Sequence, residues 1–161
     1  MTKKIDPALV QLEPEFITAI NDIFENKVVF NHTLGLKVLS VSALEVTASI
    51  AMKPELVGHF AYNRVHGGVI SASLDALGGH AVMAAIGARH MDEPIAKRVE
   101  RFTKLGTIDL RIDYLRPAIG ERFTLRAQVL RLGSRVASTR MEFLGADGTL
   151  LSTAAAAYIV S

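Results

Sequence analysis

The feature that most constrains this chain is a long apolar run from residue 67 to about 87, built mainly from Ala, Val, Ile, Leu, Met and Gly. The run is long enough for a helix of about six turns, and it has no polar face wide enough for a helix on a protein surface. His66, Asp75 and His80 border or interrupt it, and its abundant small residues are not typical of a membrane span. We therefore expect a buried central helix that the rest of the chain wraps.

One carboxylate, that of Asp75, stands in this helix. A charged side chain in an apolar setting costs several kcal/mol unless it is paired or used in chemistry. Asp75 is therefore the first candidate for a catalytic residue. The plainer interpretation is a buried acid that is satisfied by a hydroxyl, such as that of Ser71, or by backbone donors.

His66, Gly67 and Gly68 stand just before the helical run. A helix start leaves backbone N–H groups without partners and presents the positive end of the helix dipole, so an oxyanion hole can be built there. His66 can also serve as a simple capping residue, and that role is compatible with catalysis.

Four segments after the helix alternate apolar and polar residues with the period of a strand. They span residues 106–115, 121–132, 135–144 and 149–160. Turn residues separate them, including an Asp147-Gly148 pair that is typical of a hairpin. The segments predict four long antiparallel strands in a meander.

Before the helix, residues 37–52 alternate in the same way with a break near Ser42, which predicts a hairpin of two short strands. Apolar residues at three- and four-residue spacing predict an amphipathic helix over about 14–26. We expect a loop over 54–65 and a charged insertion over 88–104. Together these elements give the α+β class, with a curved antiparallel sheet wrapped around a long central apolar helix.

A chain of 161 residues with 50% hydrophobic content suits one domain, which we expect to span residues 1–161. There is no cysteine, so disulfides, thiolate nucleophiles and cysteine-ligated metal sites are excluded, in keeping with a reducing compartment. Residues 1–7 lack the apolar core and cleavage site of a secretory signal. We therefore expect a cytoplasmic protein.

Arginine is concentrated in the second half of the chain, although the net charge is only +2. Two interpretations stand, namely solvated strand faces and a site for a phosphorylated small molecule. The sequence has no helix-turn-helix signal, zinc pattern or aromatic-rich RNA-binding motif, so we expect no nucleic-acid partner.

Two segments carry a resemblance to a known family: VHGGVI at residues 65–70, with Asp75 nine positions after His66, and GTIDLRIDYLRP at residues 106–117. Over nearly the whole chain beyond residue 25, the sequence resembles hotdog-fold acyl-CoA thioesterases of the PaaI type, in the 4-hydroxybenzoyl-CoA thioesterase superfamily, and looks most like the YigI group. The resemblance implies a hotdog fold and hydrolysis of acyl-CoA to free acid and CoA, without a metal or organic cofactor. The few aromatic residues and the abundant Ala, Leu, Ile and Met favour medium- or long-chain aliphatic acyl groups.

Carried over position by position, the resemblance makes the backbone N–H of Gly67 the oxyanion donor, with His66 shaping the turn. Asp75 matches the catalytic carboxylate, which acts as a general base on water or as a nucleophile on the thioester carbonyl. Thr107 matches a position where related enzymes place a hydroxyl near the attacking water.

The sequence also offers candidates for substrate contacts. Gly68 and Asn63 are expected to contact the substrate beside the oxyanion donor. Relatives often carry Asn or Gln about six residues before the histidine, where this chain has Phe60. The phosphates of CoA are expected to meet arginines at the subunit surface. The arginine candidates are Arg135, Arg131, Arg98 and Arg101.

The spacing of Gly67 and Asp75 has a consequence for assembly. A rise of ~1.5 Å per residue puts the two groups roughly 12 Å apart along one helix, too far to serve the same carbonyl carbon. Two antiparallel central helices around a two-fold axis would bring the start of one beside the middle of the other. We expect a homodimer with two shared sites, or a dimer of such dimers, as the resemblance also implies.

Two other functions remain open at the level of sequence. Hotdog dehydratases pair a loop His-Phe with a helix acid, and His59-Phe60 before Asp75 loosely resembles that pattern. The third reading is a domain that binds acyl-CoA or acyl-carrier protein without turnover. His80 lies off the face of Asp75, so we expect it to be a packing or interface residue.

Overall fold

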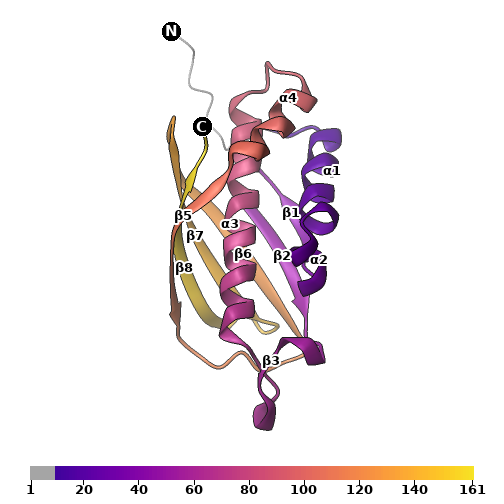
Figure 1. Ribbon diagram of the computed structural model, residues 1–161, viewed down its shortest axis with the longest axis vertical. Coiled ribbons are helices and arrows are strands. Elements are labelled where there is room, and N and C mark those ends of the chain that lie inside the picture. Colours follow the sequence, from indigo (N-terminus) through magenta and orange to yellow (C-terminus); the bar gives the residue numbers. More distant parts are fainter. Residues whose placement is uncertain (1–9) are drawn as a thin grey trace.

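The computed structural model describes residues 10–161 as one six-stranded antiparallel sheet that curves around a long helix (Figure 1). The N-terminal segment 1–7, used above to argue location, lies outside the described residues. The strands of the sheet are β1 (Lys37–Val41), β2 (Glu45–Ala51), β5 (Gly106–Tyr114), β6 (Arg122–Leu132), β7 (Val136–Gly145) and β8 (Leu150–Ile159). This arrangement confirms the predicted α+β hotdog architecture.

The central helix, α3 (Gly67–Arg89), confirms the prediction from the apolar run and extends it by two residues. Most of the helix is buried against the concave face of the sheet (Figure 1). It is the one helix within residues 10–161 that is long and apolar enough to cross a membrane, but 67% of the relevant window is buried inside the protein. This packing is that of the core helix of a soluble fold.

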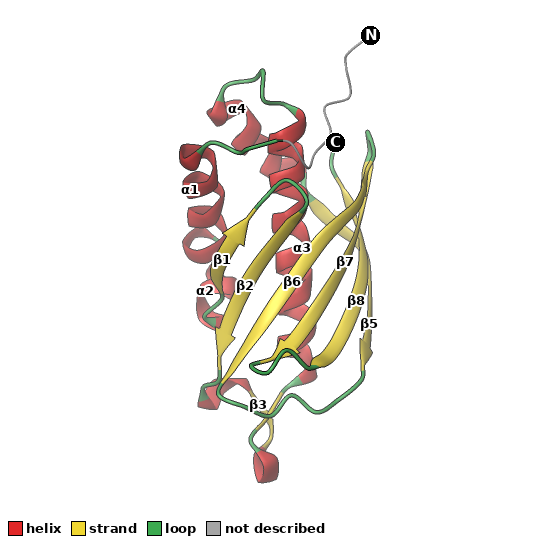
Figure 2. Cartoon of the chain, turned by 180° about the vertical axis from the view of Figure 1, so that it is seen from behind, coloured by secondary structure: helices red, strands yellow, loops and turns green. Residues whose placement is uncertain are grey.

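The order of the strands differs from the predicted meander. The sheet runs β1-β2-β6-β7-β8-β5, so β5 pairs with β8 at one edge and β2 takes the place beside β6 (Figure 2). The alternating pattern fixes which face of a strand is buried but carries no information about its neighbours. The meander prediction was therefore correct for β6 to β8 and wrong for β5.

A helical layer covers α3 on the side of β1 and β2 (Figure 1). It comprises α1 (Pro14–Asp22), a wide π-helical turn (Ile23–Lys27) and α2 (Val29–Leu34). The first two match the helix predicted over 14–26, whereas α2 was not predicted. A Cβ atom at Gly87 would lie only 2.2 Å from the ring of Phe16, so a glycine is needed for α1 to pack this closely on α3.

The predicted insertion at 88–104 contains α4 (Ile95–Glu100) and a 3-10 turn (Arg101–Lys104). Arg98 on α4 is only 1% exposed, and its guanidinium donates to both carboxylate oxygens of Glu13 at 2.6 and 3.0 Å. The same guanidinium lies 4.8 Å from the centre of the Phe16 ring. These contacts hold α4 against the start of α1.

The segment expected to be a loop at 54–65 is instead ordered. A 3-10 turn (Pro54–Leu56) leads into a small hairpin of β3 (Val57–His59) and β4 (Arg64–Val65), which projects beyond the sheet (Figure 1). A second 3-10 turn (Phe60–Tyr62) forms its tip, and Asn63 makes the reversal with φ of 47°. Phe60 is 91% exposed there.

Candidate active site

The start of α3 leaves one backbone amide free. The Gly68 N–H donates to Nδ1 of His66 at 2.8 Å, and the His66 carbonyl accepts from the N–H groups of Val69 and Ile70 at 2.9 and 3.3 Å. Within residues 10–161, the Gly67 N–H has no partner. An unpaired amide at the positive end of a long helix is suited to bind a developing oxyanion.

Two glycines allow this turn to form. A Cβ atom at Gly68 would lie 2.9 Å from Nδ1 of His66, in the path of the capping hydrogen bond. A Cβ atom at Gly58 on β3 would lie 2.5 Å from the Cα atom of His66. The hairpin therefore packs directly against the capping residue. Because Nδ1 of His66 accepts a hydrogen bond, the proton of the neutral ring is on Nε2.

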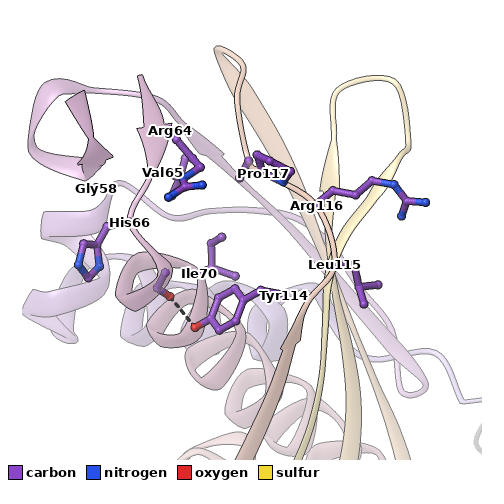
Figure 3. Close-up of a pocket in the computed structure, with 11 residues that line it drawn as sticks. Gly58, Arg64, Val65, His66, Ile70, Tyr114, Leu115, Arg116 and Pro117 are labelled. Carbon is purple, nitrogen blue, oxygen red and sulfur yellow. Dashed lines mark hydrogen bonds between the residues drawn. The ribbon is translucent and has the colours of Figure 1, made fainter. Parts of the chain in front are cut away.

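A cavity of about 520 Å³ opens beside the free amide (Figure 3). The residues that line it include Gly67, Ile70, Tyr114, Arg64 and Pro117. The guanidinium of Arg64 points toward the cavity (Figure 3).

Two further contacts shape the walls of the cavity. Arg116 also lines it, but its side chain turns away and donates to the Leu150 carbonyl at 2.9 Å (Figure 3). Tyr114, which belongs to the motif at 106–117, donates its hydroxyl to the Gly67 carbonyl at 2.9 Å (Figure 3).

Asp75 is held from two sides by neighbouring strands. Its Oδ1 atom accepts a hydrogen bond from the Thr107 hydroxyl at 2.9 Å, and its backbone carbonyl accepts one from the Tyr158 hydroxyl at 2.8 Å. Thr107 on β5 and Tyr158 on β8 are directly paired across the sheet. This pair of strand residues therefore fixes both the backbone and the carboxylate of Asp75.

A bulge in β5 makes the Thr107 contact possible. The register with β8 shifts between Thr107 and Asp109, which leaves Ile108 without a partner. A bulge re-aims the side chains on either side of it. It places Thr107 on the same face as Leu110 and Ile112, which pack against the core.

The Tyr158 hydroxyl stays a donor at any ordinary pH. Burial first, and the nearby Asp75 charge second, raise the pKa of Tyr158 above its usual range.

Sequence reasoning missed Tyr158 and the role of Tyr114, because each contact joins residues far apart in the chain. The plainer interpretation of Asp75 offered Ser71 as an example of a hydroxyl partner, whereas Ser71 donates to the Gly68 carbonyl at 3.0 Å.

The arginines predicted to bind phosphate do not gather at this cavity. The Arg98 prediction was wrong, because the Arg98 side chain is buried and its guanidinium is paired with the Glu13 carboxylate. The guanidinium of Arg101 is also paired within the chain, since its Nη2 atom donates to both carboxylate oxygens of Glu93 at 2.7 and 2.9 Å.

Arg131 and Arg135 are exposed near the β6–β7 turn. The last residue of α3, Arg89, donates to the carbonyls of Leu132 and Gly133 in that turn. Within one protomer, these two arginines therefore lie at the end of α3 opposite Gly67.

Neither His80 nor His59 lines the cavity. His80 is buried, with its Nε2 atom 2.9 Å from Oδ1 of Asn21 and its ring against Phe24, which confirms the expected packing role. His59 lies in the β3–β4 hairpin, and its ring packs against those of Phe60 and Tyr62.

The comparisons with known proteins agree with the fold and the site. The family model of the thioesterase superfamily matches residues 62–152. The chain is 34% identical over 141 residues to the medium/long-chain acyl-CoA thioesterase YigI of Salmonella typhimurium, covering 88% of this chain and 91% of that protein. The chain therefore belongs to the thioesterase superfamily.

Solved structures support the same assignment. A protein from Shewanella oneidensis described as related to the thioesterase superfamily has a TM-score of 0.85 and 36% identity, covering 92% of this chain and 99% of that one. The PaaI protein of Escherichia coli, at 15% identity and a TM-score of 0.73 over 94% and 96% of the two chains, shares the fold. The predicted resemblance to this family is thus confirmed.

Proposed function

We propose that this protein hydrolyses medium- to long-chain acyl-CoA thioesters to free acid and CoA, at sites shared between two chains. The observation that carries the proposal is that one helix presents both a free backbone amide, at Gly67, and a carboxylate held by a strand residue, at Asp75. The relative YigI named above is a medium/long-chain acyl-CoA thioesterase, and it matches 88% of this chain.

The geometry of β5 supports a shared site. β5 ends the described sheet with a free edge of nine residues, and Ile108 and Tyr114 on it are 56% and 54% exposed. A long free edge with exposed apolar side chains is suited to pair with a second copy. We propose that two β5 strands pair antiparallel about a two-fold axis near Leu110.

The charges along β5 favour this register. With the axis at Leu110, Asp109 lies opposite the partner's Arg111, and the reverse pair forms by symmetry. With Ile108 left unpaired by the bulge, Thr107 then lies opposite the partner's Ile112, two residues from the partner's Tyr114.

This register brings the two halves of the site together. Thr107 holds Asp75, and Tyr114 holds Gly67, at opposite ends of the same strand. Strands pair at a spacing of about 4.8 Å. Asp75 of one chain is thereby set beside the Gly67 amide of its partner, and the separation of roughly 12 Å along one helix is overcome.

The chemistry then follows from these groups. The Gly67 N–H binds the thioester oxygen as negative charge develops on it. We propose that Asp75 of the partner chain takes a proton from a water molecule, while the water oxygen attacks the carbonyl carbon. The carbon–sulfur bond breaks as the carbonyl re-forms, and CoA leaves as a thiolate that takes up a proton.

Thr107 favours this general-base route over direct attack by Asp75. Its hydroxyl proton is committed to Oδ1 of Asp75, which leaves the oxygen lone pairs of Thr107 free to accept from a water. Oδ2 of Asp75 can accept from the same water. In a single turnover in oxygen-18 water, an unlabelled oxygen in the first product would show direct attack by Asp75, followed by attack of water on the Asp75 carbon of the resulting anhydride.

For CoA binding, we propose Arg64 as a phosphate contact, because its guanidinium points toward the cavity beside Gly67 (Figure 3). Gly68 and Asn63 remain proposed substrate contacts from the adjoining turn and hairpin. Arg131 and Arg135 of the partner subunit remain the alternative for the phosphates. A cytoplasmic location is proposed from the soluble fold and the CoA substrate.

Thiol release from acyl-CoAs of two to sixteen carbons, plus phenylacetyl- and benzoyl-CoA, tests this function. We expect release with medium and long aliphatic chains, and a loss of at least about 100-fold in the Asp75→Asn variant. No release from any substrate by the folded protein would overturn the proposal and make enoyl-CoA hydration and acyl-CoA binding the next assays.

A further inference from the structure

The peptide group between Gly67 and Gly68 is held at both ends. Its carbonyl accepts from the Tyr114 hydroxyl at 2.9 Å, and its N–H donates to Nδ1 of His66 at 2.8 Å. The peptide group before it carries the free Gly67 N–H, and its carbonyl is fixed by Val69 and Ile70. The direction of the free amide is therefore set by neighbours that are themselves anchored.

Two consecutive glycines make such anchoring necessary. A glycine in a helix costs about 1 kcal/mol relative to alanine, because its backbone loses more conformational freedom. Gly68 must be small here, because its Cβ atom would lie 2.9 Å from Nδ1 of His66, whereas a Cβ atom at Gly67 would contact the Tyr114 ring at 3.4 Å. The first turn of α3 would consequently fray without a contact from outside the helix.

Tyr114 provides that outside contact from the sheet. It is the last residue of β5, and its hydroxyl reaches the helix across 47 positions of sequence. We propose that Tyr114 is a positioning residue, which holds the first turn of α3 so that the Gly67 N–H points at the thioester oxygen.

This inference rests on the proposed function and adds a role that neither the motif nor the mechanism assigns. It also links the oxyanion amide to the subunit interface. In the proposed β5 register, Tyr114 lies two residues from the position opposite the partner's Thr107, which holds the partner's Asp75. One strand pairing would then align the amide and the carboxylate together.

The test compares Tyr114→Phe, which keeps the ring and removes the hydroxyl, with Tyr62→Phe as a matched control. Tyr62 is exposed at the hairpin tip, and no hydrogen bond of its hydroxyl is found within residues 10–161. The loss of one hydrogen bond predicts a fall in kcat of about 3- to 10-fold for Tyr114→Phe. KM and the shape of the pH profile should stay as in the wild type.

A second readout does not depend on activity. Hydrogen exchange at the amides of residues 66–70 should become faster in Tyr114→Phe and stay unchanged in Tyr62→Phe. Unchanged kcat and unchanged exchange in Tyr114→Phe would overturn the proposal. Loss of one limb of the pH profile would also overturn it, because it would show that Tyr114 transfers a proton in the reaction. If the wild type releases no thiol, the proposed function fails, and the exchange data alone decide whether Tyr114 holds the turn.

Discussion

The oxyanion role of Gly67 can be tested by removing one hydrogen atom from the backbone. Proline has no N–H, and it is favoured at the first position of a helix, which Gly67 occupies. The preceding residue, His66, has φ of −65° and ψ of 136°, in the region that precedes proline. Gly67 is also not among the residues with positive φ, so the Gly67→Pro change fits the backbone.

The structure gives the expected size of the effect. The Gly67 N–H makes no hydrogen bond within residues 10–161, so its removal costs no folding contact, and stability should change by no more than about 1 kcal/mol. The loss of one oxyanion donor costs about 100- to 1,000-fold in kcat in other enzymes. We expect a loss of that order for Gly67→Pro, with a smaller change in KM.

Gly67→Ala is the matched control, because it adds the same Cβ atom and keeps the N–H. That atom would lie 3.4 Å from Cε1 of Tyr114, a close but tolerable contact. The assay is steady-state thiol release, with circular dichroism and the unfolding midpoint as checks of folding. A folded Gly67→Pro protein with kcat within about 3-fold of Gly67→Ala would refute the oxyanion role.

Three further predictions follow from single contacts. Thr107→Val removes the hydrogen bond to Asp75 and should lower kcat about 10-fold with little change in KM, as measured by steady-state kinetics; an unchanged kcat would contradict the role of Thr107. Arg64→Ala should raise KM for acyl-CoA about 10-fold at nearly constant kcat, whereas the same result for Arg135→Ala alone would move the phosphate site to the β6–β7 turn. Burial lowers the pKa of His80 from 6.5 to about 4. As the pH falls, His80 is therefore protonated in the unfolded chain before it is protonated in the folded protein, so the free energy of unfolding decreases between about pH 6.5 and about pH 4. Between pH 7.5 and pH 5, urea unfolding of the wild type should lose about 2 kcal/mol more than that of His80→Gln, and equal losses would contradict this.

The fold was largely predictable because its main elements have strong patterns. The apolar run of α3 and the alternation of β5 to β8 each extend over nine or more residues, and their observed bounds lie within two residues of the prediction. The neighbours of β5 were not predictable, because strand pairing depends on where the chain crosses the sheet. The hairpin at β3 and β4 was missed because its two strands have only three and two residues.

The site was predictable where a residue type is unusual in its place. A lone Asp75 in an apolar helix and the His66 cap are such cases. The hydrogen bond from Thr107 to Asp75 was not predicted, although Thr107 was named as a site residue. Arg98 was misjudged because arginine is mostly exposed in proteins, and its partner Glu13 lies 85 positions away. Contacts across such separations are properties of the folded chain.

Subunit complementation tests the shared site most directly. The Gly67→Pro and Asp75→Asn proteins, each inactive alone, are mixed under conditions that allow subunits to exchange. In a mixed dimer, one site combines an intact Gly67 amide from one chain with an intact Asp75 from the other, and the second site carries both changes. With free exchange, half of the dimers are mixed, and the shared-site arrangement predicts recovery of about a quarter of the wild-type activity. If each site were built from a single chain, no mixed dimer would contain an intact site, so no recovery after demonstrated exchange would contradict the arrangement.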